Sequence, residues 1–167
     1  MLKKAVWAIL NLIIMITIFT AEELFPLAFE GEESYNATVI TESDIIEAEN
    51  RYLVPIVGDT LYSMLCRNSY TELKNSHILP MVAAWVRYIV EPHLASRCCI
   101  YHSDRNITEA ENENSERVMR ALRLKAATLS RKLTNHLNLN SALYAEYNPE
   151  NNPLTHCFIY GNIVQIC

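Results

Sequence analysis

The chain has 167 residues, enough for one domain with its own hydrophobic core and too few for two comfortable ones. Apolar residues make up 50% of it and charged residues 20%, which is the balance of a folded globular protein rather than a disordered one. Its three glycines are too few to favour a phosphate-cradling loop, so the composition counts against a nucleotide-binding enzyme.

The net charge of −5 combines two segments of opposite sign. No lysine or arginine lies between residues 5 and 50, where many of the acidic residues gather. No acidic residue lies between Arg117 and Lys132, where the cations are Arg117, Arg120, Arg123, Lys125, Arg131 and Lys132. Opposite charges on separate segments can pair within one chain or between copies of it. The sequence leaves both arrangements open.

Residues 1–20 form an apolar N-terminal segment, in which two lysines precede an apolar run over residues 5–20. This is the outline of a signal peptide or a membrane anchor, but Ile18 or Phe19 would occupy the cleavage position that requires a small side chain. As a helix the run would measure about 24 Å, short of the roughly 30 Å hydrocarbon core of a bilayer. Three interpretations stay open: translation from Met15 with an upstream extension, a signal or anchor, and a buried apolar helix.

The next segments are an acidic arm over residues 21–40 and a helical bundle over residues 41–140. Thr41 is a good helix N-cap, and Asp44 three residues later can complete a capping box. Pro55 is expected to end this first helix, and Gly58 to form a turn before a second short helix. Pro55 and Gly58 are therefore predicted to be a structural hinge.

Two further helices follow in the bundle. One is expected to begin near Ser76, with Pro80 in its first turn, and to end or kink at Pro92. Its sequence is apolar nearly all round apart from Arg87, which predicts a central position. The other is the longest, from about Thr108 to about Leu139. Its apolar stripe is Val118, Leu122, Ala126, Leu129, Leu133 and Leu137, and the opposite side carries Arg117, Arg120, Lys125, Arg131 and Lys132.

Residues 141–167 are expected to be a linker followed by a short β-hairpin, or by a single strand, around Gly161 and Asn162. Either form would leave a strand edge with which a neighbouring copy can pair. The predicted fold class is mainly α: a small helical bundle with one long helix in its C-terminal half and a short terminal β-element.

No residue set predicts catalysis, a cofactor or a metal. The five cysteines are an odd number, which favours free thiols over a disulfide framework. The best metal candidates are Cys98, Cys99 and His102, with His156 and Cys157, but zinc needs four ligands and the C-x-x-H spacing supplies two. The basic side of the long helix fits a solvated surface, a protein interface or contact with nucleic-acid phosphates.

The order of these elements resembles the head–tail connector, or adaptor, proteins of tailed bacteriophages and prophages, and most closely those of gut Bacteroidales phages. The most telling block is "VITESDIIEAENRYLVPIVGDTLYSML", with the pattern A-E-x-R-Y-L-x-P-x-x-G-x-x-L-Y from Ala48 to Tyr62, preceded by Glu42 and Glu47. "ILPMVAAWVRYIVEPHL", the long helix and "LYAEYNPENNPLTHCFIYGNIVQI" follow in the same order. The resemblance covers residues 21–167.

The resemblance implies a helical bundle that assembles as a homo-oligomeric ring, typically a dodecamer, beneath the portal protein of the capsid. Such a ring extends the DNA channel, contacts DNA non-specifically and presents a docking surface for tail or stopper proteins. It implies no enzyme activity, and it places the chain in the virion, or in the host cytoplasm during assembly. The alternative is a membrane-anchored or exported small helical domain that uses residues 5–20 as its address.

Overall fold

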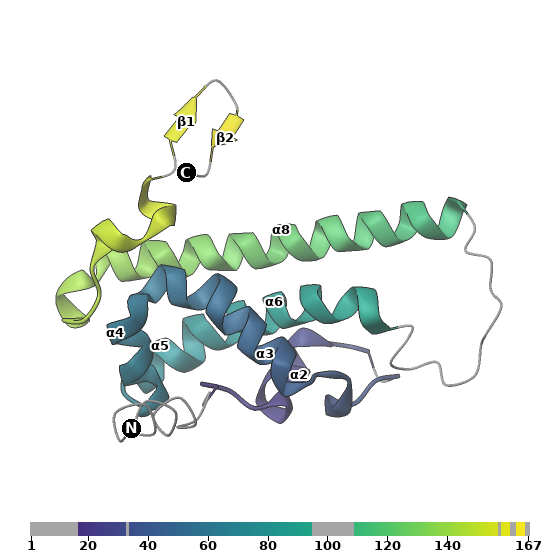
Figure 1. Cartoon of the computed structure of the whole chain (residues 1–167), viewed down its shortest axis with the longest axis horizontal. Helices are drawn as coiled ribbons and strands as arrows, with labels where there is room; N and C mark the ends of the chain where they lie inside the picture. The colour runs from purple at the N-terminus through teal and green to yellow at the C-terminus, as the bar shows by residue number, and fades with distance from the viewer. Residues whose placement is uncertain (1–16, 33, 95–108, 157, 161–162, 166–167) are drawn as a thin grey trace, which may run out of the picture.

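The computed structural model describes residues 17–32, 34–94, 109–156, 158–160 and 163–165 (Figure 1). Most of these residues are helical, as the sequence predicts. The α-helices are α2 (Ala21–Ala28), α3 (Glu42–Ala48), α4 (Val54–Cys66), α5 (Thr71–Leu73), α6 (Leu79–Val90) and α8 (Glu109–Leu139). In the described ranges, no helix combines the length and the apolar character that crossing a membrane requires. Residues 1–16, with most of the apolar N-terminal segment, lie outside those ranges.

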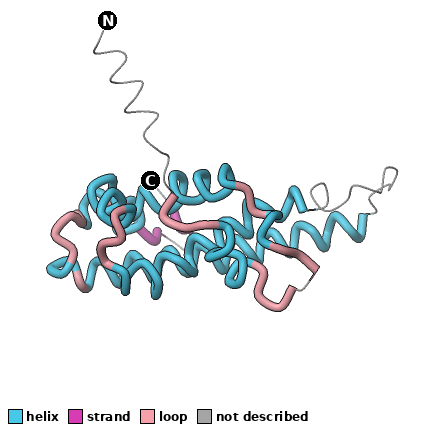
Figure 2. Tube along the Cα trace, turned by 90° about the horizontal axis from the view of Figure 1, so that it is seen from below, coloured by secondary structure: helices cyan, strands magenta, loops and turns pink. Residues whose placement is uncertain are grey.

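Helix α6 is the centre of the fold, as its nearly all-round apolar sequence predicts. It packs against α8 on one side and against α2 and α3 elsewhere on its surface, and the body is elongated along α8 (Figures 1 and 2). Two residues of α6 show the difference between these sides. Trp85 donates a hydrogen bond to Ser130 of α8, whereas the guanidinium of Arg87 lies over the ring of Phe29, directly after α2. Residues two apart on a helix point about 200° apart, so α8 and α2 meet nearly opposite sides of α6.

Residues 17–29 belong to the core, where we expected an acidic arm from residue 21 onwards. Phe19 and Leu24 are 1% and 0% exposed, and Phe29 is also buried. The backbone N–H of Thr20 donates to the carboxylate of Glu23 at 2.8 Å, which caps the start of α2. Between the acidic residues of this segment lie apolar residues at helical spacing, which form one side of the helix. That side packs on α6, so the described part of residues 21–40 is not a free arm.

The predicted capping box at the start of α3 is confirmed. The carboxylate of Asp44 accepts hydrogen bonds from the backbone N–H of Thr41 at 2.8 Å and from its hydroxyl at 2.6 Å. These bonds satisfy donors that the first turn of a helix leaves without partners.

The prediction that Pro55 ends the first helix is wrong. The chain passes from α3 through a π-helical turn, η2 (Glu49–Leu53), directly into α4, with Pro55 in the first turn of α4. The N–H of Val54 donates to the carbonyl of Glu49, five residues earlier. A proline ring clashes with the carbonyl four residues before it in an α-helix, and the wider turn gives that ring room. The helical run therefore continues past Pro55.

A π-helical turn also precedes Pro80. Helix α5 leads into a second π-helical turn, η3 (Lys74–Ile78), and Pro80 lies in the first turn of α6, as predicted. The helical run begins at Thr71 rather than near Ser76, because the π turn lets it start before the proline. The α-helix ends at Val90, and Pro92 lies in a 3₁₀ turn, η4 (Glu91–His93).

Gly58 alone makes the break that we had assigned to Pro55 and Gly58 together. Its φ of 78° and ψ of 158° interrupt α4 in a region that is almost restricted to glycine. A Cβ atom at this position would meet nothing within 4 Å, so a side chain would be strained by the backbone alone.

We therefore expect Gly58→Ala to lower the free energy of unfolding by about 1–3 kcal/mol, the cost of holding alanine in that region. Urea unfolding followed by circular dichroism measures the change. The matched control is Thr60→Ala, an exposed residue of the same helix, for which we expect a change within about 0.5 kcal/mol. Equal stability of the two variants would contradict the assignment of the break to Gly58.

Helix α8 confirms the predicted long helix, and Thr108, where we expected it to begin, lies outside the described residues. Three members of its predicted apolar stripe, Ala126, Leu133 and Leu137, are fully buried. The others, Val118, Leu122 and Leu129, are half-buried. The second half of α8 is therefore the part that the bundle covers most completely.

After α8 the chain turns back along the bundle in three 3₁₀ turns, η5 (Ser141–Leu143), η6 (Pro149–Asn151) and η7 (Pro153–His156). Tyr144 and Tyr147 are buried in this segment. Two three-residue strands follow, β1 (Phe158–Tyr160) and β2 (Ile163–Gln165), which pair antiparallel with Ile159 opposite Val164. Gly161 and Asn162, where we placed the turn, lie outside the described residues.

Candidate functional site

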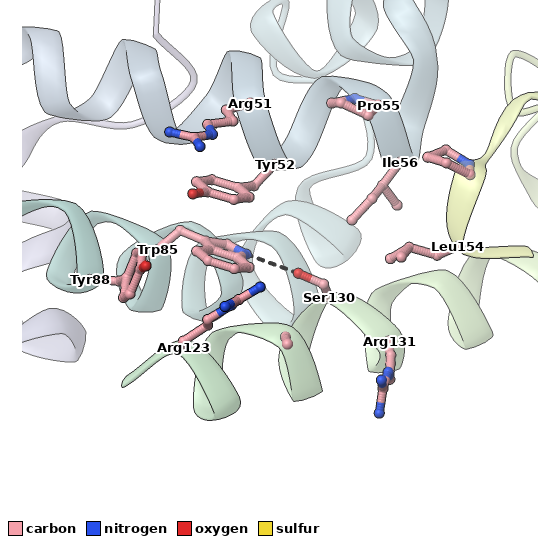
Figure 3. Close-up of a pocket in the computed structure, with 12 residues that line it drawn as sticks. Arg51, Tyr52, Pro55, Ile56, Trp85, Tyr88, Arg123, Ser130, Arg131 and Leu154 are labelled. Atoms are coloured by element: carbon pink, nitrogen blue, oxygen red, sulfur yellow. Dashed lines mark hydrogen bonds between the residues drawn. The ribbon is translucent and has the colours of Figure 1, made fainter. Parts of the chain in front are cut away.

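A cavity of about 500 Å³ lies where η2, the start of α4, α6, α8 and the C-terminal turns meet (Figure 3). Its walls are mostly aromatic and apolar, with three arginines. The lining residues are Arg51, Tyr52, Pro55, Ile56, Trp85, Tyr88, Arg123, Ala127, Ser130, Arg131, Pro153 and Leu154.

A stack of aromatic rings forms one wall of the cavity. The rings of Tyr52 and Trp85 lie parallel with 3.6 Å between their centroids, and Tyr88 meets Trp85 edge-on at 5.7 Å. The indole N–H of Trp85 donates to the hydroxyl of Ser130 at 2.9 Å, and that hydroxyl donates to the carbonyl of Ala126 at 3.2 Å. These contacts fix the orientation of both rings, so this wall is formed before anything binds.

Arg51 and Arg123 lie on opposite sides of the Tyr52–Trp85 pair (Figure 3). The guanidinium of Arg51 is 5.5 Å from the centroid of the Tyr52 ring, and it also forms an exposed ion pair with Glu47 at 3.1 Å. Burial raises the pKa of Tyr52, against the opposing charges of Arg51 and Arg123. Arg123 and Arg131 form no ion pair with a carboxylate of the described residues. The cavity therefore carries positive charge that these residues leave uncompensated.

The rim formed by Pro153 and Leu154 is held in place by a buried asparagine. Asn152 is 1% exposed, and its amide nitrogen donates to the hydroxyl of Tyr147 at 3.0 Å. Its carbonyl oxygen accepts from the backbone N–H of Leu154, also at 3.0 Å. The hydroxyl of Tyr147 in turn donates to the side-chain oxygen of Asn138 on α8 at 2.6 Å. Because an unsatisfied buried amide is costly, these bonds fix the rim against α8.

The lining chemistry favours binding over bond-breaking. None of the twelve lining residues is a carboxylate, a histidine or a cysteine. Ser130 carries the one aliphatic hydroxyl of the lining, and both of its described hydrogen bonds are structural. An activated serine needs an adjacent general base, which this lining does not supply. Guanidinium groups beside apolar walls suit a partner that presents carboxylates next to apolar side chains.

The five basic residues predicted on α8, Arg117, Arg120, Lys125, Arg131 and Lys132, are all exposed. The structure brings only Arg131 to the cavity. It adds Arg123, which was not among the predicted interface residues. Arg123, Ala127 and Arg131 follow each other at four-residue spacing, so they share one side of the helix. That spacing is the sequence signal that was missed.

The structure places the exposed acids of α2 on the side of α6 away from α8, whereas Glu47 of α3 lies beside the cavity, where it pairs with Arg51. Glu22, Glu23 and Glu30 are exposed on α2 and the turn after it, and Glu42 and Glu47 are exposed on α3. The ion pairs of the described residues are Arg51–Glu47, Arg87–Glu32 and Arg87–Glu91. None of them joins α8 to an acid of α2 or α3. Pairing of the two segments within one chain, which the sequence left open, does not occur among the described side chains.

A second polar cluster lies beneath the N-terminal residues. Glu49 is 1% exposed, and its carboxylate accepts hydrogen bonds from the N–H of Ile18, at 2.9 and 3.1 Å, and from the hydroxyl of Tyr62 at 2.6 Å. Burial raises the pKa of Glu49, with the hydrogen bonds from Tyr62 and Ile18 and the charge of Lys74 opposing it. Burial also raises the pKa of the nearby Cys66 thiol, and the charge of Glu49 adds to this. Glu49 is the last of the acidic residues that gather before residue 50, and that charge pattern did not predict its burial.

The predicted metal candidates cannot be compared with this geometry. Cys98, Cys99, His102 and Cys157 lie outside the described residues, and the side chain of His156 does as well. Within the described ranges, no three histidine, cysteine, aspartate or glutamate side chains are grouped as metal ligands require.

Comparisons with protein-family models, with curated proteins and with solved structures found no match to this chain. The features of the chain that bear on its function are therefore the cavity, the distribution of charge and the pattern from Ala48 to Tyr62.

Proposed function

We propose that the chain is a structural subunit of a phage head–tail connector ring, without enzyme activity of its own. In this function the ring binds the portal protein on one face and tail or stopper proteins on the other, and it extends the DNA channel. The observation that carries the proposal is the separation of charge: acids lie on α2 and α3, cations lie on α8, and α6 stands between α2 and α8.

Surfaces that differ in this way suit assembly in a ring. A two-fold dimer uses the same patch on both copies, whereas a ring uses two different patches that complement each other. An acidic patch on one side of a subunit and a basic patch on another meet that requirement, and they would steer one copy onto the next. The cations outside the cavity, Arg117, Arg120, Lys125 and Lys132, would then face either the neighbouring subunit or DNA in the channel.

The C-terminal strands give a second route to assembly. In a two-stranded sheet each strand keeps one edge unpaired, and β1 and β2 pair only with each other among the described residues. An unpaired edge can accept a strand from another chain. The short terminal hairpin would serve in this way as a contact between copies or with the portal protein.

The test is the mass of the assembly in solution. Full-length chain and chain begun at Met15 are each measured by native mass spectrometry and analytical ultracentrifugation, alone and with the portal protein. We expect a closed oligomer of many copies that weakens between about 0.1 and 1 M salt, since the screening length falls from about 10 to 3 Å. A monomer at high concentration, both alone and with portal protein, would refute the connector proposal. Recovery of the full-length chain only in membranes would support an anchored domain instead.

A further inference from the structure

The residues that line the cavity define the chemistry of a partner that fits it. Its apolar walls include Ile56 and Leu154, and the guanidinium groups of Arg123 and Arg131 have no ion-pair partner among the described residues. Both arginines are exposed, so they can reach a partner without a rearrangement of the core. A partner that fits presents an apolar side chain flanked by carboxylates.

The aromatic wall argues against a nucleic-acid base as the occupant. Proteins that hold single strands stack bases on free aromatic faces. Here one face of Tyr52 and one face of Trp85 cover each other at 3.6 Å, with the planes only 2° apart. The remaining faces lie toward Arg51 and Arg123 (Figure 3). Neither Tyr52 nor Trp85 therefore has both faces free for stacking, whereas the ring edges and the apolar side chains remain suited to an aliphatic group.

The outer surface of α2 has the complementary chemistry. Its exposed residues are Glu22, Glu23, Pro26 and Leu27, followed by Glu30 in the next turn. The large apolar side chains exposed in the described ranges are Leu27, Leu124, Leu139 and Leu143. Leu27 has Glu23 four residues before it and Glu30 three residues after it, whereas Leu124 is flanked by Arg123 and Lys125.

We propose that the cavity of one copy receives the outer surface of α2 from the next copy. Pro26 and Leu27 enter against the apolar wall, and Glu22 and Glu30 pair with Arg123 and Arg131. Glu23 stays on its own helix, where its carboxylate caps Thr20. The inference rests on the proposed function, since it requires copies to assemble, and it names the two surfaces that meet.

The positions of the two surfaces agree with this. Within one chain, α2 packs on the side of α6 that carries Arg87, and the cavity opens on the side that carries Trp85. The helix cannot reach the cavity of its own chain without leaving α6. Two surfaces on different sides of one subunit make a heterologous contact, which repeats from copy to copy and closes into a ring when the rotation permits.

Charge reversal on each surface tests the contact in the full-length chain. One variant is Arg123→Glu with Arg131→Glu, and the other is Glu22→Lys with Glu30→Lys. Each variant alone sets like charges against each other, so we expect its association to weaken by about tenfold or more. In an equimolar mixture every contact is again between opposite charges, because the two variants can alternate around the ring. We expect the mixture to recover the wild-type mass by native mass spectrometry.

The control is Ala121→Glu with Asn135→Glu, which adds negative charge at two exposed positions of the same helix that neither line the cavity nor belong to its basic residues. We expect this variant to assemble, and circular dichroism to show that all variants fold. Wild-type assembly that survives both charge reversals would overturn the α2 contact and leave the connector proposal standing. Loss of assembly without recovery in the mixture would overturn it as well, as would a cavity variant that loses only DNA binding. A monomeric wild-type chain would overturn both proposals.

Discussion

A chain that begins at Ala21 should fail to fold, whereas a chain that begins at Met15 should fold as the full-length chain does. The first form lacks Ile18 and Phe19, which are 6% and 1% exposed in the core. It also lacks the N–H that Ile18 donates to the buried carboxylate of Glu49. Loss of a buried phenylalanine side chain costs about 3–5 kcal/mol, a large share of the roughly 5–15 kcal/mol that stabilises a domain. Circular dichroism and thermal unfolding of the two forms measure the difference.

Single substitutions separate packing from chain length in this experiment. We expect Phe19→Ala in the full-length chain to lower the free energy of unfolding by about 3–5 kcal/mol. Leu139→Ala is the control, since Leu139 is a large apolar residue that is 85% exposed. It should change stability by only about 0.5 kcal/mol. If the chain from Ala21 unfolds at the same temperature as the chain from Met15, the N-terminal residues are not part of the core.

The elements that the sequence predicted well are those whose signals are local. Helix α8 follows from a stripe at helical spacing, and the start of α3 follows from Thr41 and Asp44 alone. The central position of α6 follows from a run of residues that is apolar on all sides. In each of these cases, neighbours within a few turns carry the information.

What the sequence did not predict depends on contacts between distant residues. The cavity joins residues near positions 52, 85, 130 and 154, and no spacing rule brings these positions together. The acids around α2 suggested an arm because they outnumber its buried residues, although Leu24 and Ala28 are buried at four-residue spacing. The two π turns were missed because a proline in a helical pattern ordinarily marks an end. Here the π turn before each proline gives the proline ring room, so the helical run does not end there.

The pattern from Ala48 to Tyr62, on which the family resemblance depends, has a structural reason at most of its positions. Ala48, Glu49, Leu53 and Leu61 are buried. Gly58 needs its positive φ, and Tyr62 donates to Glu49. The pattern thus specifies how α3 and η2 pack on α6 and how α4 continues from η2. The pattern also supplies three residues that line the cavity, Arg51, Tyr52 and Pro55.

Replacement of Glu49 is the second change with a large expected effect. Glu49→Ala would leave the N–H of Ile18 and the hydroxyl of Tyr62 without an acceptor inside the protein. Each unsatisfied buried group costs about 1–3 kcal/mol, so we expect a loss of about 2–4 kcal/mol in the free energy of unfolding. Urea unfolding at pH 7 measures it. Glu47→Ala, which removes an exposed carboxylate two residues earlier, is the control and should cost less than about 1 kcal/mol.

The pH dependence of stability should reveal the same carboxylate. The folded pKa of Glu49 lies above its ordinary value of 4.5, because burial outweighs Tyr62, Ile18 and Lys74. The folded protein therefore binds the proton more tightly than the unfolded chain does. Protonation of Glu49 therefore contributes stability that is fully present below pH 4.5 and is lost as the pH rises through the folded pKa. Glu49→Gln cannot titrate, so the stability of the wild type relative to this variant should rise as the pH falls from 7 toward 4.5. Parallel curves for wild type and Glu49→Gln would mean that the carboxylate is solvated. The hydrogen bond from Ile18 to Glu49 would then not be what holds the N-terminal residues on the core.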